Sequence, residues 1–138
     1  MDRVRDAMVP EPRTLSGDSP AQEAGELLSR PEVRAVFVCE DERLVGVVTR
    51  GTLVRDLVAV GRDPATTPVR EIAEKPRHTL DPELPLDEAF RFLETEDLER
   101  VPVTEDGRLV GVLSRSSLQR RLAEDEPPEL DEDPGTVY

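Results

Sequence analysis

The chain has 138 residues, a length that suits one domain of ordinary size or two very small ones packed together, and leaves no room for separate catalytic and regulatory domains. Acidic residues outnumber basic ones by 31 to 18, and the resulting formal charge of -13 would repel a nucleic-acid backbone. The apolar stretches are short and the start of the chain lacks the pattern of a secretory signal, so we predict a cytoplasmic protein without a membrane span. One cysteine and one histidine predict neither an internal disulfide nor a metal centre.

An internal repeat organises most of the chain. A shift of 65 residues aligns 4–57 with 69–122 without a gap, and the strongest block is LVGVVTRGTLVRDL against LVGVLSRSSLQRRL. Self-similarity of this kind indicates a duplicated unit. We therefore divide the chain into a first repeat at 1–62, a second repeat at 63–122 and a tail at 123–138.

The pattern of the first repeat predicts its elements in order. A single helical turn at 4–8 precedes a very short strand at 14–15. Pro20 then starts a helix with apolar residues at helical spacing, because proline suits the first turn of a helix. Alternating Val36 and Val38 begin a hairpin, and its Val-rich second strand leads into a last helix near Thr49. The second repeat has the same order, with an Asp-Gly turn as its stronger hairpin signal, so each unit is predicted as βαββα.

The two units are expected to pack together. A unit of this length buries too little apolar surface alone, so we expect an α/β (α+β) fold in which two pseudo-symmetric repeats pack sheet to sheet and share a core. Clefts between the two halves are then the natural place for a small ligand. The tail at 123–138 has acidic residues and prolines but no basic residue, a composition that predicts disorder.

With these features the sequence resembles a tandem pair of cystathionine-beta-synthase (CBS) domains, the Bateman module, over residues 4–122. The resemblance lies in the short leading helix, the Thr-Leu strand, the Pro-led helix, the segment RVPVTEDGRLVG at 100–111 and the Gly-apolar-apolar-Thr/Ser step into the last helix. It implies a stand-alone regulatory module that is not an enzyme and requires no cofactor. It also implies two clefts for adenosine-containing nucleotides such as AMP, ADP, ATP or S-adenosylmethionine, a homodimer, and a partner protein that the module regulates.

The family motif places a hydroxyl and a carboxylate at the start of the last helix, beside the cleft. Thr49 and Ser114 match the hydroxyl, which either caps the helix or contacts the ligand. Thr52 and Ser117 stand where the family has a carboxylate that binds the ribose hydroxyls. Because a neutral hydroxyl lacks a charge-assisted bond of about 1.5–3 kcal/mol, we expect weak or absent nucleotide binding at one cleft or both.

Three arginines are candidates for contact with a phosphate. Arg50 and Arg115 recur directly after the capping hydroxyl, and Arg100 precedes the second hairpin. A guanidinium can bind a phosphate through two parallel hydrogen bonds, or it can lie on the surface and pair with the abundant acids. If Arg115 binds ligand, its replacement by Ala lowers affinity and leaves the melting temperature unchanged. His78 is predicted to lie at the surface, and Cys39 to be a small, semi-buried residue.

The leading hypothesis is a module that senses an adenine nucleotide in the cleft between the repeats and signals to a partner. The alternative is a CBS-fold module for dimerisation or protein interaction whose clefts are degenerate and empty. An enzyme is a distant third hypothesis, because no set of nucleophile and base stands out.

Overall fold

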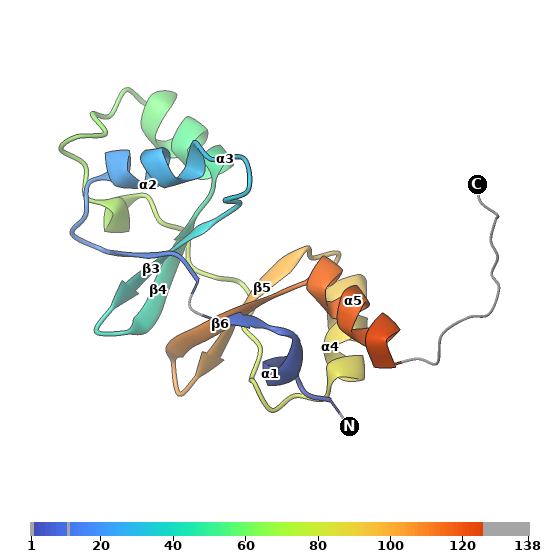
Figure 1. The fold of residues 1–138 in the computed structure, drawn as a ribbon. Coiled ribbons are helices and arrows are strands. Elements are labelled where there is room, and N and C mark those ends of the chain that lie inside the picture. Colours follow the sequence, from blue (N-terminus) through green and yellow to red (C-terminus); the bar gives the residue numbers. More distant parts are fainter. Residues whose placement is uncertain (1, 11, 126–138) are drawn as a thin grey trace, which may run out of the picture.

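Two lobes, each built around a β-hairpin, make up the molecule (Figure 1). The structure is a computed structural model that describes residues 2–10 and 12–125. The strands are β1 (Val9–Pro10), β2 (Thr14–Ser16), β3 (Val36–Glu40), β4 (Arg43–Val48), β5 (Arg100–Glu105) and β6 (Arg108–Ser114). The helices are α1 (Val4–Ala7), α2 (Ala21–Leu28), α3 (Arg50–Leu53), the π-helix η1 (Val54–Val58), the 3-10 helix η2 (Val69–Glu71), α4 (Leu86–Thr95) and α5 (Arg115–Asp125).

The mixed α/β architecture predicted from the repeat is confirmed. In the first repeat β2 pairs with β3 in parallel and β3 pairs with β4 antiparallel, so the observed order is βαββα. The helix predicted from Pro20 is α2, which buries Ala21, Ala24 and Leu28 because they lie on one face of the helix. The second repeat reproduces this arrangement with β5, β6, α4 and α5.

The second repeat differs from the prediction at its first strand. The shift of 65 residues places the counterpart of the strand at 14–15 at Thr79-Leu80, where the structure has only a single bridge between Leu80 and Val103. The chain turns immediately afterwards, because the Asp81 carboxylate accepts the backbone N–H of Glu83 at 2.8 Å. A local turn therefore ends the pairing that β2 continues in the first repeat.

The boundary of the predicted tail also differs from the structure. Helix α5 runs to Asp125, so the first three residues of the predicted tail are helical, whereas disorder was predicted for most of the tail. The prediction of disorder for 126–138 lies outside the described residues.

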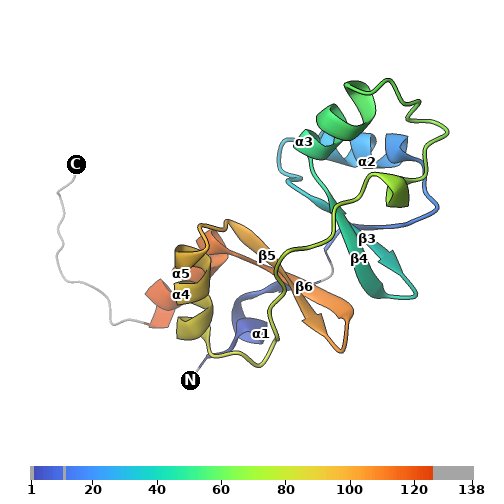
Figure 2. The same ribbon diagram turned by 180° about the vertical axis from the view of Figure 1, so that it is seen from behind.

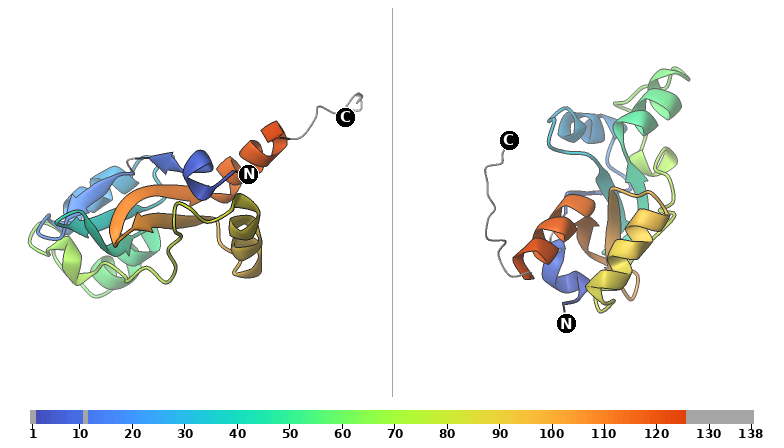
Figure 3. Two further views of the ribbon diagram at one scale, coloured as in Figure 1. Left: turned by 90° about the horizontal axis from the view of Figure 1, so that it is seen from below. Right: turned by 90° about the vertical axis from the view of Figure 1, so that its right-hand side faces the viewer.

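The leading segments of the two repeats are exchanged between the lobes. Val4, in the first repeat, is fully buried in the apolar cluster of the second lobe, and α1 lies beside α4 and α5 (Figure 3). Val69, in the second repeat, is fully buried in the cluster of the first lobe. Strand β1 pairs with β6, and Glu74 forms a bridge with Val47. The chain between η2 and α4 therefore crosses from one lobe to the other (Figure 2).

The glycine of each LVGV block makes room for the segment that crosses. A Cβ on Gly46 would lie 2.6 Å from the Cβ of Ala73, in the leading segment of the second repeat. A Cβ on Gly111 would lie 2.6 Å from the Sδ of Met8, in the leading segment of the first repeat. The repeated glycine thus permits a close approach of backbones that any side chain would obstruct.

The apolar core consists of two clusters, one in each lobe, where the sequence predicted one shared core. The first cluster comprises Ala21, Ala24, Leu28, Val33, Val36, Val38, Val48, Leu57, Val69 and Ile72. The second comprises Val4, Leu80, Leu86, Ala89, Leu93, Val101, Val103, Leu113 and Leu118. The repeats depend on each other through the exchanged segments, because each segment completes the apolar cluster of the other lobe.

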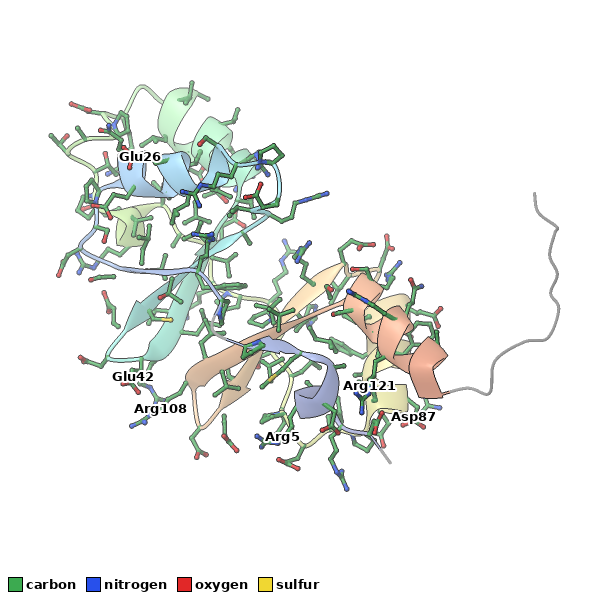
Figure 4. All side chains as sticks on the ribbon, in the orientation of Figure 1. Arg5, Glu26, Glu42, Asp87, Arg108 and Arg121 are labelled. Carbon is green, nitrogen blue, oxygen red and sulfur yellow. The ribbon has the colours of Figure 1, made fainter. Side chains whose placement is uncertain are left out.

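The hairpins of the two lobes meet at their tips. The pair Arg43 and Arg108 joins β4 to β6, so that all six strands belong to one sheet. The backbone N–H of Leu44 donates to the Gly107 carbonyl at 3.1 Å. The Arg108 guanidinium lies 3.4 Å from the Glu42 carboxylate (Figure 4). This junction fixes the hairpins against each other on the side away from the helices α3 and α5.

Candidate functional site

Two clefts related by the sequence repeat lie between the lobes. The larger has a volume of about 530 Å³ and the smaller about 230 Å³. Thr49 lines the larger cleft and its repeat partner Ser114 lines the smaller. His78 likewise lines the larger cleft, and Arg13, the residue at the equivalent position of the first repeat, lines the smaller. The two clefts predicted from pseudo-symmetry are therefore present, but they differ in size and in the side chains that line them.

The larger cleft combines an apolar wall with basic side chains. Its apolar lining is Ala35, Phe37, Val47, Pro76, Leu98, Val101 and Pro102. Its basic lining is Arg34, Lys75, Arg77 and Arg100, to which His78 adds an imidazole. Lys75 and Arg77 reach the cleft because the bridge between Glu74 and Val47 fixes the crossing segment against β4. A cleft of this kind suits a ligand with a flat apolar part and an anionic part.

The basic side chains of the clefts lack partners, whereas most other basic side chains have them. In the described part of the chain, the basic side chains without a hydrogen bond or ion pair are Arg13, Arg30, Arg34, Lys75, Arg77, Arg91, Arg100 and Arg120. Most of these line one of the two clefts. In an acidic chain, cations left unpaired in a cleft are available to an anionic ligand.

The two acidic residues of the larger cleft form ion pairs with arginines that lie outside it. The Glu74 carboxylate forms an ion pair with Arg55, and the Glu99 carboxylate lies 3.9 Å from the Arg115 guanidinium. Neither of these arginines lines the cleft. The ion pairs offset the negative charge of the two acids, so the positive charge of the lining dominates.

The predicted site residues divide into three that line clefts and four that have other contacts. Thr49 lines the larger cleft, Ser114 the smaller, and Arg100 both. Arg50, Thr52, Arg115 and Ser117 line neither of these two clefts.

Thr52 and Ser117 take part in helix capping. The Thr52 hydroxyl accepts the Thr49 backbone N–H at 3.1 Å, and the Thr52 N–H donates back to the Thr49 hydroxyl. Ser117 and Ser114 repeat this exchange, with 2.8 Å between their hydroxyl oxygens. Thr52 is only 1% exposed. Each hydroxyl that replaces the family's carboxylate therefore forms hydrogen bonds within a capping box.

The two recurring arginines bind the ends of the preceding helices. Arg50 donates to the Arg30 carbonyl at 2.7 Å, just beyond α2, and Arg115 donates to the Leu93 carbonyl at 3.0 Å, in the last turn of α4. Each carbonyl also accepts a backbone N–H, from Val33 at 3.0 Å and from Leu98 at 2.9 Å, so the arginine adds a second, charged donor at the negative end of the helix dipole. Each repeat therefore uses this arginine to hold its two helices together.

Several lining residues were not singled out in the sequence. These are Arg13, Arg34, Lys75 and Arg77. The cluster Lys75, Arg77 and His78 directly before the second Thr-Leu pair was the available signal. Its significance depends on the crossing of the segment, which the sequence pattern does not reveal.

His78 and Cys39 have distinct surroundings. The His78 ring packs edge to face on Phe92 with centroids 5.1 Å apart, and its Nε2 lies 3.9 Å from the Glu96 carboxylate. It is half-buried and lines the larger cleft, where the sequence predicted a surface residue. Cys39 is semi-buried as predicted, and burial raises the pKa of its thiol.

Comparison with known proteins identifies the family. The family model for the CBS domain matches residues 4–59 and 69–124. The chain belongs to the CBS domain family. The tandem pair inferred from the repeat is thereby confirmed, and a pair of CBS domains is a regulatory module.

Curated relatives and solved structures agree with this assignment. The chain is 29% identical over 118 residues to the CBS domain-containing protein YhcV of Bacillus subtilis, which covers 86% of this chain and 84% of the relative. It is 29% identical over 102 residues to Hypoxic response protein 1 of Mycobacterium tuberculosis, covering 73% and 71%.

Among solved structures, Hypoxic Response Protein I with two coordinated zinc ions is 26% identical, with a TM-score of 0.75 over 88% of this chain and 99% of that chain. CBSX2 in complex with AMP is 24% identical, with a TM-score of 0.74 over 90% and 98%, and shows the shared fold.

Two further findings concern metals and membranes. Within residues 2–10 and 12–125, no group of three or more His, Cys, Asp or Glu side chains is placed to hold a metal ion. The helices of the same residues include none that is both long and apolar enough to cross a bilayer.

Proposed function

We propose that this pair of CBS domains binds an adenosine-containing nucleotide in the larger cleft and regulates a partner protein through it. The observation that carries the proposal is the set of unpaired cations around an apolar wall, in a chain whose formal charge is -13. The volume of about 530 Å³ lies within the range of about 300–1,000 Å³ that small-molecule sites occupy. CBSX2, a protein of the same fold, binds AMP, so the fold is compatible with a nucleotide.

In this proposal the base packs on the apolar wall and the phosphate meets the cations. The half-buried Val47 and Leu98 offer surface to the base, while Arg34, Arg77 and Arg100 offer charged donors to the phosphate oxygens. Such a lining favours AMP, ADP or ATP over S-adenosylmethionine, because the sulfonium of the latter carries a positive charge. No cofactor is needed for this role.

The affinity is expected to be modest. This chain lacks the carboxylate that binds the ribose hydroxyls in the family motif. The Thr52 hydroxyl at that position is buried and already forms hydrogen bonds within its helix cap. We therefore expect a dissociation constant of roughly micromolar or weaker for AMP. Sub-micromolar binding would show that another group on this chain replaces the carboxylate.

Ligand binding can be transmitted because the larger cleft is lined from both repeats. Arg34 and Thr49 come from the first repeat, and Arg77 and Leu98 from the second. A ligand that binds one arrangement of the lobes better than another shifts their population toward that arrangement. A partner that distinguishes the two arrangements would then sense the ligand.

Calorimetric titration with AMP, ATP and S-adenosylmethionine tests the proposal. Arg77→Ala removes a lining cation and is expected to weaken AMP binding roughly 10-fold or more. Arg91→Ala is the matched control, because Arg91 is also exposed and unpaired but lies on α4 outside both clefts. An absence of heat for all three ligands at about 1 mM, or an equal loss in both variants, would favour the interaction module with empty clefts.

Ligand retained during purification offers an independent test. One tyrosine and no tryptophan give the protein a weak ultraviolet background, so a bound adenine would dominate the spectrum near 260 nm. A homodimer, a cytoplasmic location and the absence of enzymatic activity remain predictions. Sedimentation at several protein concentrations tests the first of these.

A further inference from the structure

The two clefts share part of their lining. Arg34 and Arg100 line both clefts, together with Ala35 and Phe37. The side chains of Arg34 and Arg100 are exposed and have no hydrogen bond or ion pair to any residue that the structure describes. Each cleft is therefore lined by these two arginines, whose exposed side chains have no partner in the described part of the chain.

A shared cation couples the two clefts. A guanidinium that donates paired hydrogen bonds to one anion presents its remaining donors elsewhere, so a second anion meets a group whose charge is already offset. The two anions also repel each other across the shared wall. Occupation of one cleft is therefore expected to weaken binding in the other, and by linkage the effect would be reciprocal.

The smaller cleft suits a smaller ligand. Its volume of about 230 Å³ lies below the lower limit of about 300 Å³ that is usual for drug-sized ligands. Its own cation is Arg13, which lines this cleft and not the larger one. Among the described lining residues Glu32 is the acid, and its negative charge opposes the binding of an anion. These features fit a small oxyanion better than a whole nucleotide.

We propose that the smaller cleft is a site for a small oxyanion, and that this anion and the nucleotide of the larger cleft antagonise each other through Arg34 and Arg100. The coupling rests on the proposed function, whereas the oxyanion site does not. Concentrations of such an anion would then set the nucleotide level at which the module responds.

Titrations with inorganic phosphate test both parts at constant ionic strength. Phosphate is first titrated into the protein without nucleotide, and AMP is then titrated at increasing phosphate concentrations. We expect phosphate to raise the AMP dissociation constant to a plateau about 5-fold or more above its starting value. A plateau is the signature of two sites, because direct competition in the larger cleft would raise the constant without limit.

Two variants separate the clefts. Arg13→Ala is expected to weaken phosphate binding roughly 10-fold, to remove most of the phosphate effect on AMP, and to leave AMP binding unchanged when phosphate is absent. Arg77→Ala is expected to weaken AMP binding and leave phosphate binding unchanged. Arg91→Ala is the control for a lost surface charge and should change neither.

Each outcome decides one of the two proposals. Phosphate binding that does not depend on Arg13, or a phosphate effect on AMP that persists in Arg13→Ala, overturns the oxyanion site. If AMP fails to bind while phosphate binds through Arg13, the nucleotide function and the coupling both fall and the oxyanion site stands. If both ligands bind independently, the coupling through Arg34 and Arg100 is wrong.

Discussion

The exchanged leading segment gives the sharpest test of the fold. Val4 belongs to the first repeat by sequence, yet it is 0% exposed within the apolar cluster of the second lobe. Val4→Ala removes two buried methyl groups, each worth about 0.8 kcal/mol of transfer free energy. With the cavity that remains, we expect the free energy of unfolding to fall by about 2–3 kcal/mol.

Urea denaturation followed by circular dichroism measures this loss, and hydrogen exchange locates it. Val4→Ala should accelerate amide exchange in β5 and β6 more than in β3 and β4, because Val4 packs in the lobe of β5 and β6. Val69→Ala should show the reverse pattern, since Val69 packs in the first lobe. Val60→Ala is the control: Val60 is 63% exposed, and its loss should change stability by less than about 0.5 kcal/mol.

Two outcomes would contradict the exchange of the leading segments. A loss below about 0.5 kcal/mol for Val4→Ala would mean that the residue is not packed as described. Faster exchange in β3 and β4 for that variant would mean that each leading segment packs within its own repeat.

Three further predictions concern single side chains. Gly46→Ala should destabilise the protein by about 1–3 kcal/mol through overlap with the crossing segment. Gly51→Ala should stabilise it by about 0.5–1 kcal/mol, because a Cβ at this position in α3 would make only an ordinary contact of 3.8 Å with the Thr49 Oγ1; urea midpoints decide both. Arg115→Ala should lower the free energy of unfolding by about 1 kcal/mol, because it removes the charged donor to the Leu93 carbonyl and leaves that carbonyl only the Leu98 N–H. A melting temperature equal to that of the wild type would restore the ligand-binding interpretation of Arg115. Burial raises the pKa of the Cys39 thiol, so less thiolate is present at pH 8 in the folded state, and a disulfide reagent should react more slowly than in urea; equal rates would contradict that burial.

The site shows why its residues were only partly predictable. Thr49 and Ser114 were identified because they match the hydroxyl of the family motif, which is a local pattern, and both line clefts. Whether Thr52 and Ser117 face a ligand or a cap depends on side-chain rotamers and burial, and both bond within their caps. Arg13 and Arg77 reach clefts only because the leading segments cross between lobes, which no local pattern encodes.

The spacing of residues along the chain was sufficient to predict the duplication, the βαββα order and the family. Tertiary structure alone decided that Val4 and Val69 complete each other's lobes and that Gly46 and Gly111 make room for the crossing. The unequal volumes of the two clefts, and the presence of Arg34 and Arg100 in the lining of both, also follow only from the packed structure. The physical reason is that burial and charge in a cleft depend on segments brought together from distant parts of the chain, so they are properties of the packed pair.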